Sequence, residues 1–366
     1  KNREFGFDTF CDDLGPAKIV HLYVPECELR AMVVVDNVAR GPAIGGVRMA
    51  QDVTVDEVFR LARAMTLKNA AAGLPHGGGK AGIRADPKLV DKPRQIRAFA
   101  RSIRDLKDYT PGPDMGTNEQ CMAWIHDEIG RAAGLPRSLG GIPLDEIGAT
   151  GWGVACCAEV AASFCELDLD GARLAVEGFG NVGRHAARFL AQLGVRLVAA
   201  SDTQGTLYNP GGIDVERLAE IKRAGGRVCD YRDGESRAQV DLFRVPCEIL
   251  VPAARPDCIH AGNVDAIEAR LILQGANIPC TADAEARLHE RGVVNVPDFI
   301  ANAGGVICAA VEYAGGTEVQ AMEQIAERIR ENTREVLVRS RDDHILPRLA
   351  AVELARQRIA TAMQPA

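Results

Sequence analysis

The chain has 366 residues, of which 47% are hydrophobic and 25% charged, and its formal net charge is −7. This length predicts two domains with well-buried cores. The composition excludes disordered, collagen-like and coiled-coil proteins. Because the lysines and arginines are scattered through an acidic chain, no basic stripe is available to neutralise a phosphate backbone, and we expect no nucleic-acid partner.

The cysteine pattern and the hydropathy indicate a cytoplasmic protein. Eleven cysteines are dispersed without a C-x-x-C pair, and the adjacent Cys156 and Cys157 point in different directions if they are helical, so we expect reduced thiols and no metal site. No apolar run reaches the ~18 residues that span a bilayer, and no signal-peptide pattern opens the chain, so we expect no membrane partner. The start at Lys1 leaves open whether a targeting segment was removed.

The first part of the chain, 1–148, is predicted to form an α/β domain. Alternating apolar runs at 19–24 and 30–35 predict an antiparallel strand pair. Thr54 and Glu57 stand in capping-box spacing at the start of a predicted helix over 55–72. The other features are a helix over 93–106 and glycine- and proline-rich segments at 41–46, 74–80 and 111–114.

The second part, 149–316, alternates short apolar strands with helical patterns, which is typical of a buried parallel sheet with helices on both faces. The predicted strands are 173–177, 196–200, 248–251, 271–274 and 293–296. The segment 317–366 is predicted to form C-terminal helices that pack back on the body. Its first helix opens with a capping box at Thr317 and Gln320, and another helix follows Pro347. One face of that first helix carries Val319, Met322, Ile325, Ile329 and Val336.

A dinucleotide-binding motif lies between a predicted strand and a helix. In the G-x-G-x-x-G of 178–183, Gly178 makes a tight turn, Gly180 lets the backbone approach a pyrophosphate, and Gly183 allows close helix–strand contact. Asp202 follows at the end of the next strand, where its carboxylate could hold the ribose hydroxyls. This acid favours NAD over NADP, although NADP stays possible because Ser201, Thr203 and nearby arginines could accept a phosphate. The remaining motif positions expected at the cofactor are Asn181 and Val182.

Two lysines and an aspartate are candidates for the chemistry. Lys68 and Lys80 lie on apolar or glycine-rich backgrounds, where one ammonium could bind a substrate carboxylate and the other, desolvated, could act as a general base. Asp114, between turn residues, could move a proton to or from an amine. The alternative from spacing alone is a surface lysine pair and a turn-forming aspartate.

The sequence resembles the glutamate/leucine/phenylalanine/valine dehydrogenase family. The motifs that carry the resemblance keep the family's order and spread across most of the chain. The matching segments are 41–48, 65–68, 77–80, 112–115, 149–153, 178–183, 275–277 and 301–306. The resemblance implies that Lys68 binds the α-carboxylate, Lys80 activates a water and Asp114 moves protons at the amino group. It also implies a homo-oligomer assembled through the first domain. It further implies that Gly45 and Gly46 line the substrate site and that Thr150, Asn277 and Asn302 lie near the nicotinamide.

Two positions depart from the members that act on glutamate. Those members carry a lysine and a serine, which hold the side-chain carboxylate, where this chain has Ile44 and Ala309. A buried carboxylate without a cation costs several kcal/mol, so we expect an apolar amino acid as substrate. His76 could contact substrate or fill space, and Trp152 could shape the pocket or belong to the core.

Together these features predict an N-terminal α/β substrate domain, a Rossmann-type doubly wound parallel-sheet domain and a cleft between them. The expected activity is NAD(P)-dependent oxidative deamination of an L-amino acid to its 2-oxo acid and ammonia. Glutamate dehydrogenase, a 2-hydroxy-acid dehydrogenase and a metabolite-binding homologue without activity are the alternatives. The hydroxy-acid enzyme usually relies on a histidine beside an arginine, and no such constellation is evident in the sequence.

Overall fold

The computed structural model describes residues 10–364, which group into two compact units. Unit 1 contains the chain up to Pro143, Ala309–Glu318 and the segment from Ala355 onward. Unit 2 contains Leu144–Cys308 and Val319–Leu354. The segment 317–366 is therefore shared between the two units.

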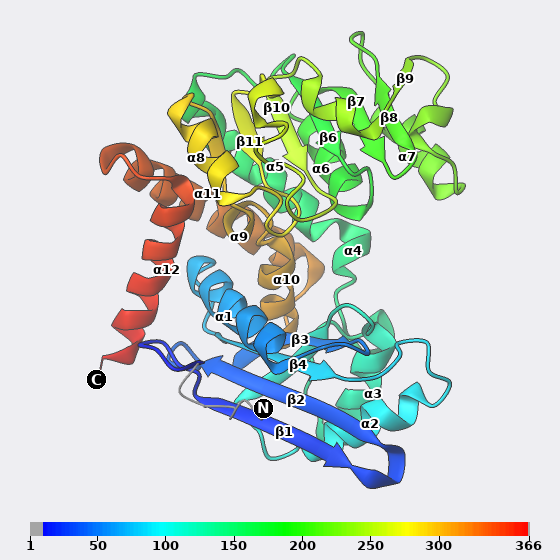
Figure 1. The fold of residues 1–366 in the computed structure, drawn as a ribbon, viewed down its shortest axis with the longest axis vertical. Helices are drawn as coiled ribbons and strands as arrows, with labels where there is room; N and C mark the ends of the chain where they lie inside the picture. Colours follow the sequence, from blue (N-terminus) through cyan, green and yellow to red (C-terminus); the bar gives the residue numbers. More distant parts are fainter. Residues whose placement is uncertain (1–9, 365–366) are drawn as a thin grey trace. The chain divides into compact units, whose positions relative to one another are not determined.

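Unit 1 is built on a mixed sheet with the strand order β1-β2-β4-β3-β5 in its described part (Figure 1). The predicted antiparallel pair is present, and β4 also runs antiparallel to β2, whereas β3 runs parallel to both β4 and β5. Strands β3, β4 and β5 overlap the glycine- and proline-rich segments in which the sequence analysis predicted no strand. The bounds are β1 (Lys18–Val24), β2 (Leu29–Asn37), β3 (Ala43–Met49), β4 (Gly77–Ile83) and β5 (Tyr109–Pro113).

Gly78 of β4 is needed because a helix lies directly on the strand there. A Cβ at Gly78 would come within 2.1 Å of the Thr66 backbone nitrogen. Thr66 belongs to α1 (Val55–Ala71), whose predicted N-cap Thr54 accepts a hydrogen bond from the Glu57 backbone at 3.3 Å. Since every residue of β4 is buried, no alternating pattern marks it as a strand.

Helices cover both faces of the unit 1 sheet. Along β2, Val33 and Val35 pack with α2 (Lys92–Ser102) and α3 (Glu119–Ile129), whereas the alternate residues Met32 and Val34 pack with α1. This alternation is that of a strand buried on two sides.

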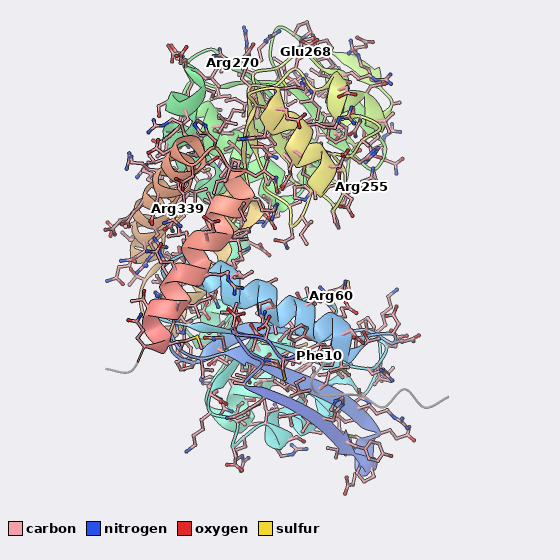
Figure 2. All side chains as sticks on the ribbon, turned by 60° about the vertical axis from the view of Figure 1, so that its left-hand side comes forward. Phe10, Arg60, Arg255, Glu268, Arg270 and Arg339 are labelled. Atoms are coloured by element: carbon pink, nitrogen blue, oxygen red, sulfur yellow. The ribbon has the colours of Figure 1, made fainter. Side chains whose placement is uncertain are left out.

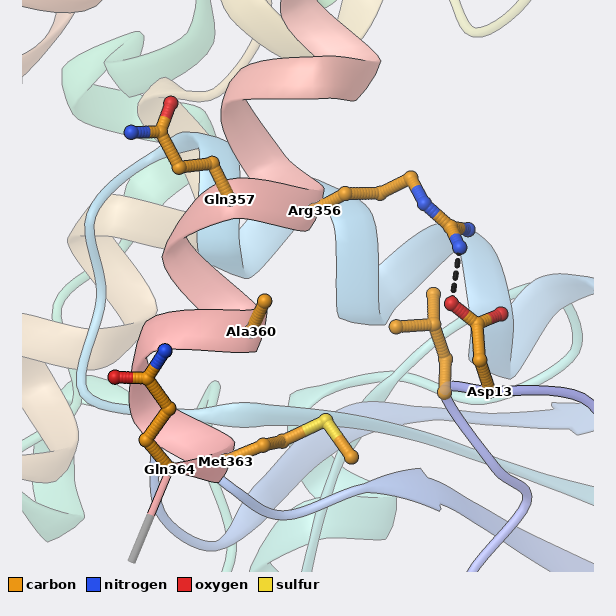
Figure 3. Close-up of a pocket in the computed structure, with 7 residues that line it drawn as sticks. Asp13, Arg356, Gln357, Ala360, Met363 and Gln364 are labelled. Carbon is orange, nitrogen blue, oxygen red and sulfur yellow. Dashed lines mark hydrogen bonds and ion pairs between the residues drawn. The ribbon is translucent and has the colours of Figure 1, made fainter. Parts of the chain in front are cut away.

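Residues near the C-terminus join unit 1 through specific contacts. Glu312, in α10 (Gly304–Tyr313), accepts hydrogen bonds from the backbone nitrogens of Gly134, Leu135 and Ile142 at 2.7–3.0 Å. Near the end of α12 (Pro347–Met363), Arg356 pairs with Asp13 beside a surface depression of about 550 Å³ (Figure 3).

Unit 2 has the strand order β12-β11-β10-β6-β7-β8-β9 in its described part. The strands from β12 to β7 are parallel, and β8 and β9 add an antiparallel edge that the sequence did not indicate. The five predicted strands are confirmed to within two residues at either end. The bounds are β6 (Arg173–Glu177), β7 (Arg196–Asp202), β8 (Gly205–Tyr208), β9 (Glu235–Arg237), β10 (Ile249–Pro252), β11 (Leu271–Leu273) and β12 (Val294–Val296).

The strand order reverses at β6, because the chain proceeds from β6 to β7 on one side and later returns to β10 on the other. In a doubly wound sheet, ligands bind at the carboxyl ends of the strands at such a reversal. The helices of the unit are α4 (Leu144–Ile147), α5 (Ala149–Ala161), α6 (Asn181–Ala191), α7 (Val215–Arg223), α8 (Ala282–Glu290), α9 (Asp298–Ala301) and α11 (Glu318–Asp342).

Helix α11 buries Ile325, Ile329 and Val336 as predicted, whereas Val319 is 67% exposed. Val319 belongs to the first turn of the helix, ahead of the part that packs. Charged side chains of both signs cover the outside of unit 2, as Glu268 and Arg270 illustrate (Figure 2).

The segment Leu144–Cys165 is long and apolar enough to cross a membrane, contrary to the expectation from the sequence. It is nevertheless 67% buried within the protein. A Cβ on Gly151 of α5 would lie 2.6 Å from the Ala186 backbone nitrogen of α6, so this helix packs as a core element of unit 2.

Candidate active site

A carboxylate held between two cations lies at the ends of the central strands of unit 1. Asp114 follows β5 directly, and its Oδ1 is 3.0 Å from Nζ of Lys80 on β4. Its Oδ2 accepts a hydrogen bond from Nε of Arg48 on β3 at 2.8 Å. Arg48 also pairs with Glu57 at the start of α1. The structure therefore brings together the predicted Lys80 and Asp114 and adds Arg48, which the sequence reasoning had not singled out.

The environment of Lys80 lowers the pKa of its ammonium group. The side chain is only 7% exposed, and this burial lowers the pKa of Lys80 by more than the Asp114 carboxylate raises it. The positive charge of Arg48 lowers the pKa further. A lysine whose pKa is lowered in this way is a better candidate for a general base than an exposed lysine.

Position 46 requires glycine because Asp114 and Lys80 lie very close to its backbone. A Cβ there would lie 2.7 Å from Cβ of Asp114 and 3.1 Å from Nζ of Lys80. The neighbouring Gly45 accepts a hydrogen bond through its carbonyl oxygen from the buried Tyr109 hydroxyl at 2.8 Å. Both glycines thus hold the strand close to the Lys80–Asp114 pair.

The remaining predicted substrate residues also belong to unit 1. Ile44 lies on β3 opposite Gly78 on one side and Thr110 on the other, and it is 8% exposed. Lys68 lies in the last turn of α1, and Ala309 lies on α10.

Replacing Arg48 with methionine is expected to shift the pH dependence of the reaction. Loss of its charge raises the pKa of Lys80, so the rise of kcat/KM with pH should move to higher pH by about one unit. Profiles of kcat/KM against pH for the wild type and for R48M would measure this shift. The exposed Arg101 provides a control, since R101M should leave the profile in place. A shift to lower pH would contradict the assigned electrostatics.

In unit 2, the turn from β6 to α6 fits a pyrophosphate. Gly178 has a φ of +87°, and a Cβ on Gly183 would lie 2.1 Å from the Gly178 carbonyl oxygen. Gly180 is the N-cap of α6, without a side-chain cap, and a Cβ there would meet nothing within 4 Å. The first N–H groups of α6, including those of Asn181 and Val182, are thus open to an anion.

Asp202 ends β7 as predicted, but it has a cation beside it. Its Oδ2 is 2.7 Å from Nζ of Lys222 and accepts a hydrogen bond from the Val228 nitrogen. Burial opposes ionisation of Asp202, yet these partners outweigh it and lower its pKa. The carboxylate is therefore charged and its position is fixed.

Replacing Asp202 with alanine should shift the cofactor preference towards NADP, because it removes an acceptor for ribose hydroxyls and leaves Lys222 available to a 2′-phosphate. We expect NAD affinity to fall by about tenfold or more, the loss typical of a hydrogen bond to a charged group, while NADP affinity is kept or gained. Titration of each dinucleotide followed by fluorescence would measure both. D233A, on the exposed partner of Arg217, is the matched control. An unchanged ratio would show that Asp202 does not contact the ribose.

Three further predicted residues gather in unit 2. Nδ2 of Asn302 donates to Oδ1 of Asn277 at 3.0 Å and lies 3.3 Å from the carbonyl oxygen of Gly275. Thr150 lies close to Gly305, which follows Asn302 by three residues. A Cβ on Gly305 would be 3.2 Å from Oγ1 of Thr150. The depression in Figure 3 is lined by none of the predicted site residues.

Sequence reasoning missed three residues. They are Arg48, Lys222 and Tyr313, the last of which lies with its ring centroid 5.6 Å from that of His76. Arg48 could have been found, because in a strand it points to the same side as Ile44 and Gly46. Lys222 comes close to Asp202 only through the packing of α7, and Tyr313 approaches His76 only through the fold. No local signal marks either contact.

A doubly wound dinucleotide unit and a buried lysine–carboxylate pair define a nicotinamide-dependent enzyme acting on amino acids. Residues 140–366 match the Glutamate/Leucine/Phenylalanine/Valine dehydrogenase family, and residues 16–131 match the Glu/Leu/Phe/Val dehydrogenase dimerisation domain. The chain belongs to this family, and it is an NAD(P)-dependent amino-acid dehydrogenase.

Individual relatives agree with this assignment. The chain is 41% identical to the glutamate dehydrogenase of Aeropyrum pernix, over 82% of this chain and 77% of that protein. It is 43% identical to the glutamate dehydrogenase of Thermotoga maritima, over 76% of this chain and 70% of that protein. The structure of a hetero-hexameric glutamate dehydrogenase from Thermus thermophilus, in a leucine-bound form, superposes with a TM-score of 0.83 at 31% identity, covering 95% of this chain and 89% of that one.

Proposed function

We propose that this enzyme deaminates an L-amino acid with an apolar side chain, and that Lys80 and Asp114 are its catalytic residues. The observation that carries the proposal is the pairing of Lys80 and Asp114 at 3.0 Å, with a largely buried lysine whose pKa is lowered by burial. Such a pair provides a base and a proton carrier within reach of one substrate nitrogen.

In the proposed mechanism, Lys68 binds the substrate α-carboxylate and Asp114 removes a proton from the amino group. Bound NAD(P) supplies the acceptor for the α-hydrogen as hydride. Neutral Lys80 then takes a proton from the water that adds to the imine carbon. Asp114 returns a proton to the nitrogen of the carbinolamine. Ammonia leaves as the C–N bond breaks, and the Asp114 carboxylate accepts the hydroxyl proton as the carbonyl of the 2-oxo acid forms. Arg48 keeps the Asp114 carboxylate in place throughout, through its hydrogen bond to Oδ2.

The apolar preference follows from the surroundings of Ile44. Its paired neighbours across the sheet are Gly78 and Thr110, neither of which carries a charge. A carboxylate buried against Ile44 and Ala309 would lack a cation, whereas an apolar side chain gains about 0.8 kcal/mol per buried methylene.

Glutamate is the second candidate substrate, because the relatives with about 40% identity are named glutamate dehydrogenases. One assay separates the candidates: oxidation of NADH or NADPH with a panel of 2-oxo acids, each with and without ammonium. Ammonium-dependent turnover of apolar 2-oxo acids supports the proposal, and a preference for 2-oxoglutarate supports the second candidate. Turnover without ammonium would indicate a hydroxy-acid dehydrogenase, and no turnover a binding protein.

We also propose a homo-oligomer in the cytoplasm. The match of residues 16–131 to a dimerisation domain supports assembly through unit 1, and light scattering that gives a monomer at high concentration would contradict it. All eleven cysteines lie within residues 10–364 and no disulfide joins them there, a pattern typical of a reducing compartment. Fractionation of cells would test the location.

A further inference from the structure

His76 is a buried side chain to which the mechanism assigns no role. It directly precedes β4, where alternate residues share a face, so its side chain is directed to the same side of the sheet as Gly78 and Lys80. Gly78 is the strand partner of Ile44. His76 is therefore a near neighbour of Ile44, on the face that carries the catalytic lysine.

A helix from a distant part of the chain completes the surroundings of His76. The ring of Tyr313 on α10 meets the His76 ring edge to face, with 5.6 Å between the centroids. Tyr313 follows Ala309 by one helical turn, so the two residues share a side of α10. The imidazole therefore has an aromatic ring beside it, and Ala309 lies on the same side of α10 as that ring.

The atom of His76 that lacks a partner, Nδ1, is a hydrogen-bond acceptor. His76 is 7% exposed, and its buried Nδ1 has no hydrogen-bond partner among residues 10–364. Burial lowers the pKa of His76 more than a hydrogen bond to the Pro42 backbone raises it, so the ring is neutral at pH 7. A neutral ring that donates its proton to Pro42 presents a lone pair at Nδ1. A buried lone pair without a donor is costly, and a ligand can supply that donor.

We propose that His76 selects, through Nδ1, an amino acid whose aromatic side chain carries one neutral hydrogen-bond donor, such as a phenol O–H or an indole N–H. This inference rests on the proposed function and makes the substrate class specific. A site built to bind such a donor discriminates strongly against the analogue that lacks it, because the acceptor is then left unpaired. The edge of Tyr313 beside the ring favours an aromatic ligand over an aliphatic one.

The test compares pairs of substrates that differ only in the donor. The pairs are tyrosine against phenylalanine, tryptophan against its benzothiophene analogue, and threonine against valine. We expect the wild type to prefer tyrosine and tryptophan over their partners by tenfold or more in kcat/KM, with little difference in the aliphatic pair.

Variants of His76 then assign the preference to the Nδ1 lone pair. In H76L the tyrosine-to-phenylalanine ratio should fall to near one, and in H76N, whose amide oxygen replaces Nδ1, it should be largely restored. H21L changes an exposed histidine of the same unit and should keep the wild-type ratio. Equal turnover of tyrosine and phenylalanine by the wild type, or a ratio unchanged in H76L, overturns the inference while the deamination itself stands. Absence of NAD(P)-dependent turnover with every amino acid, and of ammonium-dependent turnover with every 2-oxo acid, overturns the proposed function instead.

Discussion

Replacing Lys80 with alanine is expected to lower kcat/KM for oxidative deamination by about 10³-fold, within the range for loss of a general base. Dinucleotide affinity should stay within a factor of two or so, because Lys80 belongs to unit 1 whereas the pyrophosphate turn belongs to unit 2. Steady-state kinetics together with NADH titration would measure both quantities.

Two further variants distinguish a base from a fixed charge. K80R keeps the positive charge but cannot become neutral, so it should be as inactive as K80A. K88A removes an exposed lysine near the same strand and should keep full activity. An active K80R would show that Lys80 only supplies charge, and the water would then need a different base.

The largest change in substrate choice is expected from the double replacement I44K/A309S. Lysine at position 44 would add an ammonium to a site where the strand partners of that position, Gly78 and Thr110, offer a substrate carboxylate no cation. We expect the ratio of kcat/KM for glutamate over phenylalanine to rise by about 100-fold, which corresponds to the ~2–3 kcal/mol of a buried charged hydrogen bond. Measurement of both substrates with each variant gives the ratio.

Size and charge are separated by I44M, which has nearly the length of lysine without its charge. It should leave glutamate a poor substrate. If the unmodified enzyme already prefers glutamate tenfold or more over every apolar or aromatic amino acid, then another group holds the side-chain carboxylate and the role assigned to Ile44 is wrong.

Features whose signals are local could be predicted from the amino-acid sequence. The β6 strand, the glycines at 178–183 and Asp202 follow one another in a short stretch, so their pattern predicted both the structure and the cofactor class. The capping residue Thr54 likewise fixed the start of α1, because the hydrogen bond it accepts comes from the next turn.

Tertiary structure alone decided the features that depend on contacts between distant segments. Strands β3 to β5 were hidden because burial on both faces removes the alternation of polar and apolar residues, and because α1 requires glycine where it touches β4. The Arg48–Asp114 hydrogen bond, the Lys222–Asp202 ion pair and the meeting of His76 with Tyr313 each join residues from different elements. Periodicity and motif spacing describe one element at a time, so only the packing of helices and strands could bring these side chains together and set their charges.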